Sequence, residues 1–249
     1  MLNDLWLGWK FTLSYFTILP VMFEKGINLD TKEILGYFLF WLPSIGLILS
    51  SISIGIFLLI EPLGWLGALI SAISYMMLYG FVHTEAIIDV VDALYAKHSN
   101  KDAYSVIKEP TIGALGALWG FAIMLIKVAS FSFLLLHHQY LYIIAIATIS
   151  RLSILILFYI QKFKSSFLDK LQQNFTTQKL ISSYILFSII GISFIGVWFV
   201  YMLIVGVAIS YIVSQITTKS LGFCNGDVVG FSLELCEMFL MILVSVYHL

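Results

Sequence analysis

The sequence is poor in charge, in cysteine and in basic tracts, and each shortage excludes a class of protein. Only 11% of its 249 residues are charged, whereas a soluble domain has roughly 25%, so a water-soluble fold is not expected. The two cysteines, Cys224 and Cys236, are too few for a disulfide framework or a zinc site. We expect both to be ordinary apolar residues. Without a basic tract, and with a net charge of −1, nucleic acid is not an expected partner.

Apolar residues make up 61% of the chain, and its mean hydropathy is +1.01. Several apolar runs are long enough to cross a bilayer, which takes about 20 residues each. The first residues lack a basic segment followed by a small-residue cleavage site, so no cleaved signal peptide is expected. The sequence therefore predicts one membrane-embedded domain over 1–249, an all-α polytopic bundle of about six to seven transmembrane helices.

The apolar runs predict seven spans. Residues 1–23, rich in aromatic side chains and stopping at Pro20, predict an interfacial helix or a short re-entrant element. The run that begins at residue 63 has no breaker, so we expect one long helix to continue to residue 94. Polar loops are expected at 96–111, 161–180 and 217–227. The predicted spans cover about 38–60, 63–82, 112–136, 140–160, two short helices within 181–216 broken near 191–196, and 228–249.

Lysine placement predicts the orientation. Eleven of the twelve lysines lie before the first span or in the loops 96–111, 161–180 and 217–227, all on one face of a seven-span bundle. By the positive-inside rule that face is cytoplasmic. The acidic segment after residue 80 and the Gly226-Asp227 turn then lie at the same membrane surface. With one crossing in 181–216, Asp227 would lie on the opposite side.

The segment Gly80–Leu94 carries Glu85, Asp89 and Asp92 among apolar residues. On a helix these spacings place the three carboxylates within an arc of about 60°. Ionised carboxylates this close repel one another, and a divalent cation would remove that cost. Oxygen-only donors favour Mg²⁺ or Mn²⁺, so all three are expected metal ligands. A solvated helix end remains the alternative. His83 faces away from the arc, which favours hydrogen bonding over metal binding.

A second acidic group lies near the end of the chain. Asp227, Glu234 and Glu237 either complete a polar pocket with the first group, or the two glutamates are neutral or lysine-paired in the bundle interior. Arg151, the only arginine, lies inside a span, where its planar fork suits either phosphate binding or an internal salt bridge. Lys127, also within a span, is expected to be structural or to reach towards the membrane surface.

The first lysine-bearing loop ends with Lys108 and a Gly113-x-x-Gly116 spacing at the start of a predicted helix. Free N–H groups at a helix start favour phosphate, and Lys108 adds positive charge there. The same glycine spacing also serves helix packing, and both interpretations stay open.

These segments follow patterns of a known family over nearly the whole chain. Its G-x-x-H-x-D-G-x-x-D-x-x-D-G is matched by Gly80, His83, Glu85, Ala86, Asp89, Asp92 and Ala93. Its K-D-S-R-x-G-x-x-G is matched by Lys108, Glu109, Pro110, Thr111, Gly113 and Gly116. Its G-D-x-x-G with a following N-E-x-x-E is matched by Gly226, Asp227, Gly230, Leu233, Glu234 and Glu237, and two shorter patterns by Phe16, Thr17, Pro20, Pro43 and Gly46. The chain resembles the cobalamin synthase family, the adenosylcobinamide-GDP ribazoletransferases.

The chain departs from the family patterns at several positions. Glutamate replaces aspartate at 85 and 109, alanine replaces glycine at 86 and 93, and Thr111 stands where the family has arginine. The lost arginine removes a phosphate clamp, for which Arg151 is one candidate replacement. A member with altered substrate or activity, or an inactive scaffold, therefore stays open.

The resemblance implies a phosphotransferase of the bacterial inner membrane, in contact with lipid and active at its cytoplasmic face. Adenosylcobinamide-GDP would supply the phosphoryl group, α-ribazole or its 5′-phosphate the attacking hydroxyl, and GMP would leave. Mg²⁺ would be held by Glu85, Asp89 and Asp92. The catalytic residues implied are Asp89, Asp92, Lys108, Asp227 and Glu234. The substrate-binding residues implied are His83, Lys108, Gly113, Gly116, Arg151, Gly226 and Glu237.

Two alternative functions, and the oligomeric state, remain open at this point. A CDP-alcohol phosphatidyltransferase also places Asp-x-x-Asp at a helix end, but its Gly-x-x-Ala-Arg and its further Asp-x-x-x-Asp are missing here. A cation- or proton-coupled carrier would need acidic residues near the membrane midplane on discontinuous helices. A homo-oligomer is neither predicted nor excluded.

Overall fold

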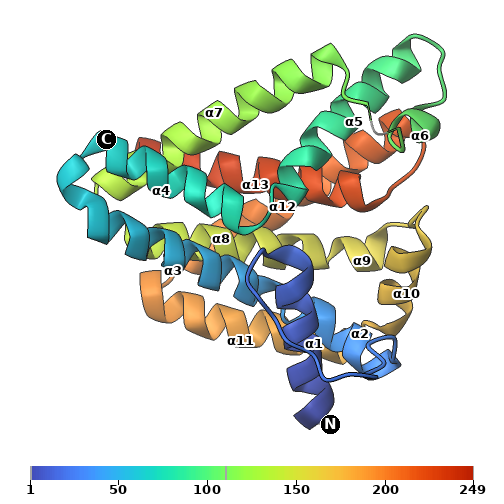
Figure 1. The fold of residues 1–249 in the computed structure, drawn as a ribbon, viewed down its shortest axis with the longest axis horizontal. Helices are drawn as coiled ribbons and strands as arrows, with labels where there is room; N and C mark the ends of the chain where they lie inside the picture. The colour runs from blue at the N-terminus through green and yellow to red at the C-terminus, as the bar shows by residue number, and fades with distance from the viewer. Residues whose placement is uncertain (1, 110, 249) are drawn as a thin grey trace.

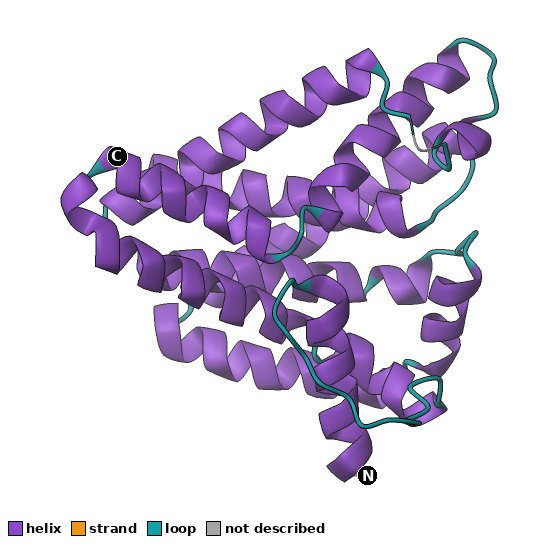
Figure 2. Cartoon of the chain, in the orientation of Figure 1, coloured by secondary structure: helices purple, strands orange, loops and turns teal. Residues whose placement is uncertain are grey.

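The computed structural model describes residues 2–109 and 111–248, and the regular elements in these residues are all helices (Figure 2). The predicted all-α fold is thus confirmed. Residue 1, Pro110 of the second family pattern, and residue 249 at the end of the last predicted span lie outside the described residues. In chain order the elements are α1 (Leu2–Phe16), α2 (Lys32–Phe40), α3 (Leu42–Ile60), the short 3₁₀ helix η1 (Glu61–Leu63), α4 (Trp65–Leu78), α5 (Val82–His98), α6 (Ala103–Val106), α7 (Ala114–Leu136), α8 (Tyr140–Leu155), α9 (Leu157–Ile160), α10 (Ser166–Asn174), α11 (Thr177–Ile195), α12 (Trp198–Leu221) and α13 (Gly226–Tyr247).

The bundle is polytopic, as predicted. In the described residues, six helical segments are long and apolar enough to cross a membrane, and the bent pair α4 and α5 raises the number to seven. The predicted break within 181–216 is confirmed, because α11 ends at Ile195 and Gly196 turns the chain with a φ of 61°. The two helices are longer than expected, with 19 and 24 residues, because they extend into the flanking polar loops.

The prediction of one helix from residue 63 to residue 94 is wrong. The chain bends by 79° between α4 and α5. Gly80 and Phe81 both adopt left-handed backbone conformations there, with φ of 61° and 57°. Gly80 tolerates this conformation at no steric cost, and the Ile18 N–H supports the bend by donating to the Leu78 carbonyl at 2.9 Å. The bend turns α5 away from the direction of α4 (Figure 1).

The expected loop at 161–180 also contains an element that the sequence analysis missed. Residues Ser166–Asn174 form α10, whose first turn is capped by the Ser165 hydroxyl, which accepts from the Leu168 N–H.

At the N-terminus, α1 crosses the direction of the long helices (Figure 1). The Thr12 hydroxyl holds α1 to the end of α2 by donating to the Phe38 carbonyl at 2.8 Å. The segment 1–23 is thus helical over Leu2–Phe16, and its place at the membrane interface stays a prediction.

Helix α8 is the central element, with buried side chains around most of its circumference. Gly46 on α3 lies so close to the Ala147 carbonyl of α8 that no side-chain carbon fits between the two helices. On α12, Gly206 has the same function, because an added Cβ would lie 2.8 Å from Ile149. Large apolar side chains on α4, α7, α11 and α12 remain exposed on the outside of the bundle, as expected for a surface in contact with lipid.

The lysine-bearing segments meet at one end of the bundle, opposite the C-terminus in Figure 1. The Lys164 N–H donates to the Cys224 carbonyl at 2.7 Å, which joins two of these loops. The Lys164 ammonium lies 3.7 Å from the ring centre of Tyr104 in a third. Lys179 pairs with Glu33 at 3.1 Å, and Lys170 pairs with Asp30. A bundle that crosses the membrane seven times must have all these loops at the same end, and this is the arrangement observed.

Helices α5 and α7 approach closely along a face of small residues on α7. A Cβ added to Gly116 would lie 2.5 Å from the Asp92 carboxyl carbon and 2.6 Å from the Ile88 carbonyl oxygen. A Cβ added to Gly120 would lie 2.7 Å from the Ile88 side chain. Small residues of this kind let helix backbones approach in membranes, where close packing replaces the hydrophobic effect.

We predict that Gly116→Ala destabilises the protein by about 1–3 kcal/mol, because the new methyl group overpacks the contact between α5 and α7. Gly55→Ala is the matched control: it makes the same change in helix propensity, and an added Cβ at Gly55 meets no heavy atom within 4 Å. The unfolding temperature in detergent measures the difference. Equal values for the two variants would show that this helix contact is not tight.

Candidate active site

The first acidic group lies on α5, immediately after the bend. Glu85 is exposed, whereas Asp89 and Asp92 are partly buried. The start of α13 packs against this helix, since a Cβ added to Gly230 would lie 2.9 Å from the Ala86 methyl. Asp227, one turn earlier on α13, therefore stands beside the same face. Asp89 lies within electrostatic range of Asp227, Glu85 and Asp92, so the structure brings the first acidic group and Asp227 together.

Asp92 has a second set of partners that the sequence analysis did not anticipate. One of its carboxylate oxygens accepts from the Gly113 N–H at 2.6 Å, and the other accepts from the Gly116 N–H at 2.8 Å. Asp92 thus caps the N-terminus of α7, where a negative charge is favoured. The two N–H groups expected to bind phosphate are already satisfied. Of the two interpretations of these glycines, the structure shows helix packing.

The acidic group offers carboxylate oxygens and little else. Within residues 2–109 and 111–248, no three His, Cys, Asp or Glu side chains converge into a ready-made metal cage. Mg²⁺ does not need such a cage, because it commonly takes one or two carboxylates together with substrate phosphates and water. One or two of the carboxylates of Glu85 and Asp89 suit a hard cation that completes its shell with substrate oxygens and water. Asp92, the third predicted ligand, has both carboxylate oxygens bonded to backbone N–H groups of α7.

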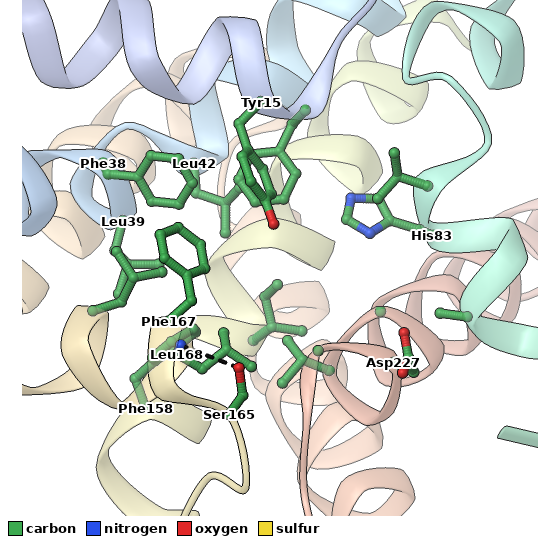
Figure 3. Close-up of a pocket in the computed structure, with 18 residues that line it drawn as sticks. Tyr15, Phe38, Leu39, Leu42, His83, Phe158, Ser165, Phe167, Leu168 and Asp227 are labelled. Carbon is green, nitrogen blue, oxygen red and sulfur yellow. Dashed lines mark hydrogen bonds between the residues drawn. The ribbon is translucent and has the colours of Figure 1, made fainter. Parts of the chain in front are cut away.

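Asp227 also faces a cavity of about 290 Å³, which His83 and Gly226 help to line (Figure 3). Asn225 fixes this corner: its side-chain carbonyl accepts from the Val228 N–H at 3.2 Å, and its amide donates to Asp227 at 2.6 Å. Asp227 is thereby oriented at the start of α13, between the cavity and Asp89. In Figure 3, His83 and Asp227 lie on the same side of the view, opposite Phe38 and Leu39.

Lys108 lies at the lysine-rich end of the bundle. Its ammonium stands 4.1 Å from the ring centre of Tyr104, the same ring that Lys164 covers. In the described part of the chain, Lys108 makes no ion pair with an acidic side chain. Thr111, which stands at the family's arginine position, directs its hydroxyl to Glu109 at 3.5 Å. The structure therefore leaves Lys108 free to contact an incoming anion but does not join it to the acidic group.

The remaining predicted site residues lie in a buried ionic cluster. The Lys127 ammonium is 2.6 Å from Glu234 and 2.9 Å from Glu237, and Arg151 pairs with Glu237. All four side chains are at most 2% exposed. The lysine-paired alternative for the two glutamates and the internal salt bridge for Arg151 are thus the arrangements observed. This placement gives no support to a catalytic Glu234, or to substrate contacts by Arg151 and Glu237.

Two tyrosines that the sequence analysis missed complete this cluster. The Tyr75 hydroxyl accepts from Arg151 at 2.8 Å, and the Tyr79 hydroxyl accepts from Lys127 at 3.3 Å. Tyr75 lies on α4 and Tyr79 directly follows its end, and their four-residue spacing directs both hydroxyls to the charged side chains of α7 and α8. A pair of tyrosines at this spacing inside an apolar span was the available signal.

We predict that Lys127→Met destabilises the protein by about 3–5 kcal/mol, because it leaves the buried carboxylate of Glu234 without a counter-ion, whereas Glu237 keeps Arg151. Lys170→Met is the control: its pair with Asp30 is exposed at the surface, and its loss costs under about 1 kcal/mol. Chemical unfolding in detergent measures both. The Lys127→Met, Glu234→Gln double variant should recover part of the loss. A Lys127→Met protein as stable as Lys170→Met would contradict a paired cluster.

Comparison with known proteins identifies the family. A family model described as cobalamin-5-phosphate synthase matches residues 8–245. The adenosylcobinamide-GDP ribazoletransferase of Clostridium perfringens is 27% identical over 236 residues, which cover 91% of this chain and 92% of that protein. Those of Brevibacillus brevis and Acinetobacter baumannii are 23% and 27% identical, and each match covers 95% of this chain and 97% of the relative. No solved structure matches. The chain, with its acidic face at the meeting of α5 and α13, belongs to the cobalamin-5-phosphate synthase family.

Proposed function

We propose that this protein is an integral membrane transferase that joins adenosylcobinamide-GDP to α-ribazole or its 5′-phosphate and releases GMP. The observation that carries the proposal is the meeting of Asp89 and Asp227, two residues of separate family patterns, in a chain that the family model matches from residue 8 to residue 245. The relatives named for this activity match over nearly their full length, which supports the same overall reaction.

The acidic face supplies the groups that this reaction needs. Glu85 and Asp89 would hold Mg²⁺ against the pyrophosphate of the nucleotide-activated substrate, with Asp92 fixing α5 to the start of α7. The metal would neutralise negative charge that develops on the departing phosphate. Asp227, oriented by Asn225 and open to the cavity, would accept the proton of the attacking hydroxyl.

The lysine-rich end would face the cytoplasm in the bacterial inner membrane. This assignment is supported by the meeting of the lysine-bearing loops at one end of the bundle. Lys108 and Lys164, both at the ring of Tyr104, would attract the anionic substrates to this surface. The exposed apolar faces of α4, α7, α11 and α12 would contact lipid.

We predict that Asp89→Asn abolishes GMP release while the protein keeps its unfolding temperature. The substitution removes a charge that holds the metal and preserves the shape of the side chain. Purified protein in detergent, with both substrates and Mg²⁺, provides the assay. Glu61→Gln, at the exposed 3₁₀ helix after α3, should keep wild-type turnover. EDTA should stop the wild type and Mg²⁺ should restore it. Turnover by Asp89→Asn at the wild-type rate would refute the metal assignment.

The orientation predicts which loops a membrane-impermeant thiol reagent reaches in intact cells. Lys101→Cys, between α5 and α6, should stay unlabelled until the cells are lysed. His137→Cys, after α7, should be labelled from outside. Both positions are exposed, and the native Cys224 and Cys236 are buried, so the background is low. The reverse pattern would place the acidic face on the outer side.

A further inference from the structure

The first turn of α5 carries His83 and Glu85 and directly follows the bend after α4 (Figure 1). Phe81 occupies the N-cap position of this turn, and its phenyl ring has no oxygen that could accept from the free N–H groups. Phe81 also has a φ of 57°, a left-handed conformation that is unfavourable for a bulky residue and persists only where neighbouring contacts hold it. The place of this turn therefore depends on contacts from other parts of the chain.

The Tyr79 hydroxyl makes such a contact. It lies 3.0 Å from the Thr84 hydroxyl, so a residue just before the bend is bonded to one just after it. The Lys127 ammonium donates to the Tyr79 oxygen at 3.3 Å, which leaves the phenolic proton to be donated to Thr84. Tyr79 and Thr84 are only 1% and 3% exposed, so these bonds form in surroundings where water does not compete.

Lys127 anchors this contact to the rest of the bundle. Its ammonium on α7 is 2.6 Å from the Glu234 carboxylate on α13, and both side chains are buried. On the other side, Thr84 directly precedes Glu85 in α5, and Asp89 follows one turn later. A continuous chain of polar contacts thus runs from the buried ionic cluster to the start of the acidic face, through Glu234, Lys127, Tyr79 and Thr84.

We propose that Tyr79 and Thr84 are positioning residues for the acidic face: their two hydroxyls hold the first turn of α5 so that Glu85 and Asp89 keep their place beside Asp227. The inference rests on the proposed transferase function and deepens it, because it assigns the alignment of the carboxylates to two residues of the bundle interior. Both hydroxyls are buried, so they act through α5 and not by contact with substrate.

Tyr79→Phe and Thr84→Val each remove one hydroxyl and nearly keep the volume of the side chain. Each should lower kcat about tenfold, because small displacements of aligned groups slow the chemical step. The KM for α-ribazole should change by less than about twofold, since uniform binding is retained. The double variant should lose no more than either single variant, because both changes break the same bond. Thr84→Ser keeps the hydroxyl and should keep wild-type turnover.

Tyr75→Phe is the matched control. It removes the other tyrosine hydroxyl of the ionic cluster, which accepts from Arg151 at 2.8 Å and lies one turn before the bend. This variant should lower the unfolding temperature about as much as Tyr79→Phe and leave kcat unchanged. If kcat falls equally in Tyr75→Phe and Tyr79→Phe, the loss reflects the stability of the cluster, and the inference is overturned.

A spin label gives a readout that needs no turnover. Val82 in the first turn of α5 and Ile73 on α4 are exposed, and the native cysteines are buried, so Val82→Cys and Ile73→Cys can each be labelled alone. In the EPR spectrum of detergent-purified protein, Tyr79→Phe and Thr84→Val should make the label at position 82 more mobile and leave the label at position 73 unchanged. Tyr75→Phe should change neither spectrum.

Unchanged mobility at position 82 in both variants would overturn the inference. If Tyr79→Phe does not fold, Thr84→Val decides the test, because it leaves the pair of Lys127 with Glu234 in place. Wild-type protein that releases no GMP, with a label at position 82 that still responds to Thr84→Val, would refute the transferase and leave the role of the two hydroxyls in holding α5 intact.

Discussion

The ionic cluster of Lys127, Arg151, Glu234 and Glu237 determines how the long helices sit against one another. Its four charges balance, and all are buried within the bundle. In lipid surroundings none of them has water as an alternative partner, so α7, α8 and α13 are held in one register. Because α13 and α7 both pack against α5, the same register sets where Asp227 and the start of α7 meet the acidic face. The acidic face thus depends on charges that are buried within the bundle.

Much of the bundle follows from composition and periodicity, because apolar runs of spanning length have few alternatives to helix in a membrane. The break at Gly196 and the acidic face of α5 were predicted on these grounds. The bend at Gly80 and Phe81 was not, since it depends on contacts with the segment after α1. The helix α10 lies in a polar segment whose pattern is short. Local sequence carries little information about such tertiary effects.

The sequence also could not predict which partners the charged residues have. From the sequence, Arg151 could bind either a phosphate or an acidic side chain. Only the packing of α8 against α13 makes Glu237 its partner. The spacing of Gly113 and Gly116 was compatible with a phosphate-binding loop or with a contact between helices. Asp92 of α5 accepts from both N–H groups, so the glycines form a contact between α5 and α7. In both cases the sequence defines the chemistry of a group, whereas the fold chooses its partner from residues more than twenty positions away.

This choice of partner bears on the loss of arginine at position 111. Arg151 does not replace the lost phosphate clamp, because its guanidinium is buried against Glu237 and Tyr75. Thr111 turns to Glu109, so no guanidinium lies at the acidic face in the described residues. In the proposed reaction, neutralisation of the substrate phosphates would fall to a cation held by Glu85 and Asp89, and to Lys108 and Lys164. A chain that relies on point charges instead of a bidentate fork holds phosphate with less geometric constraint.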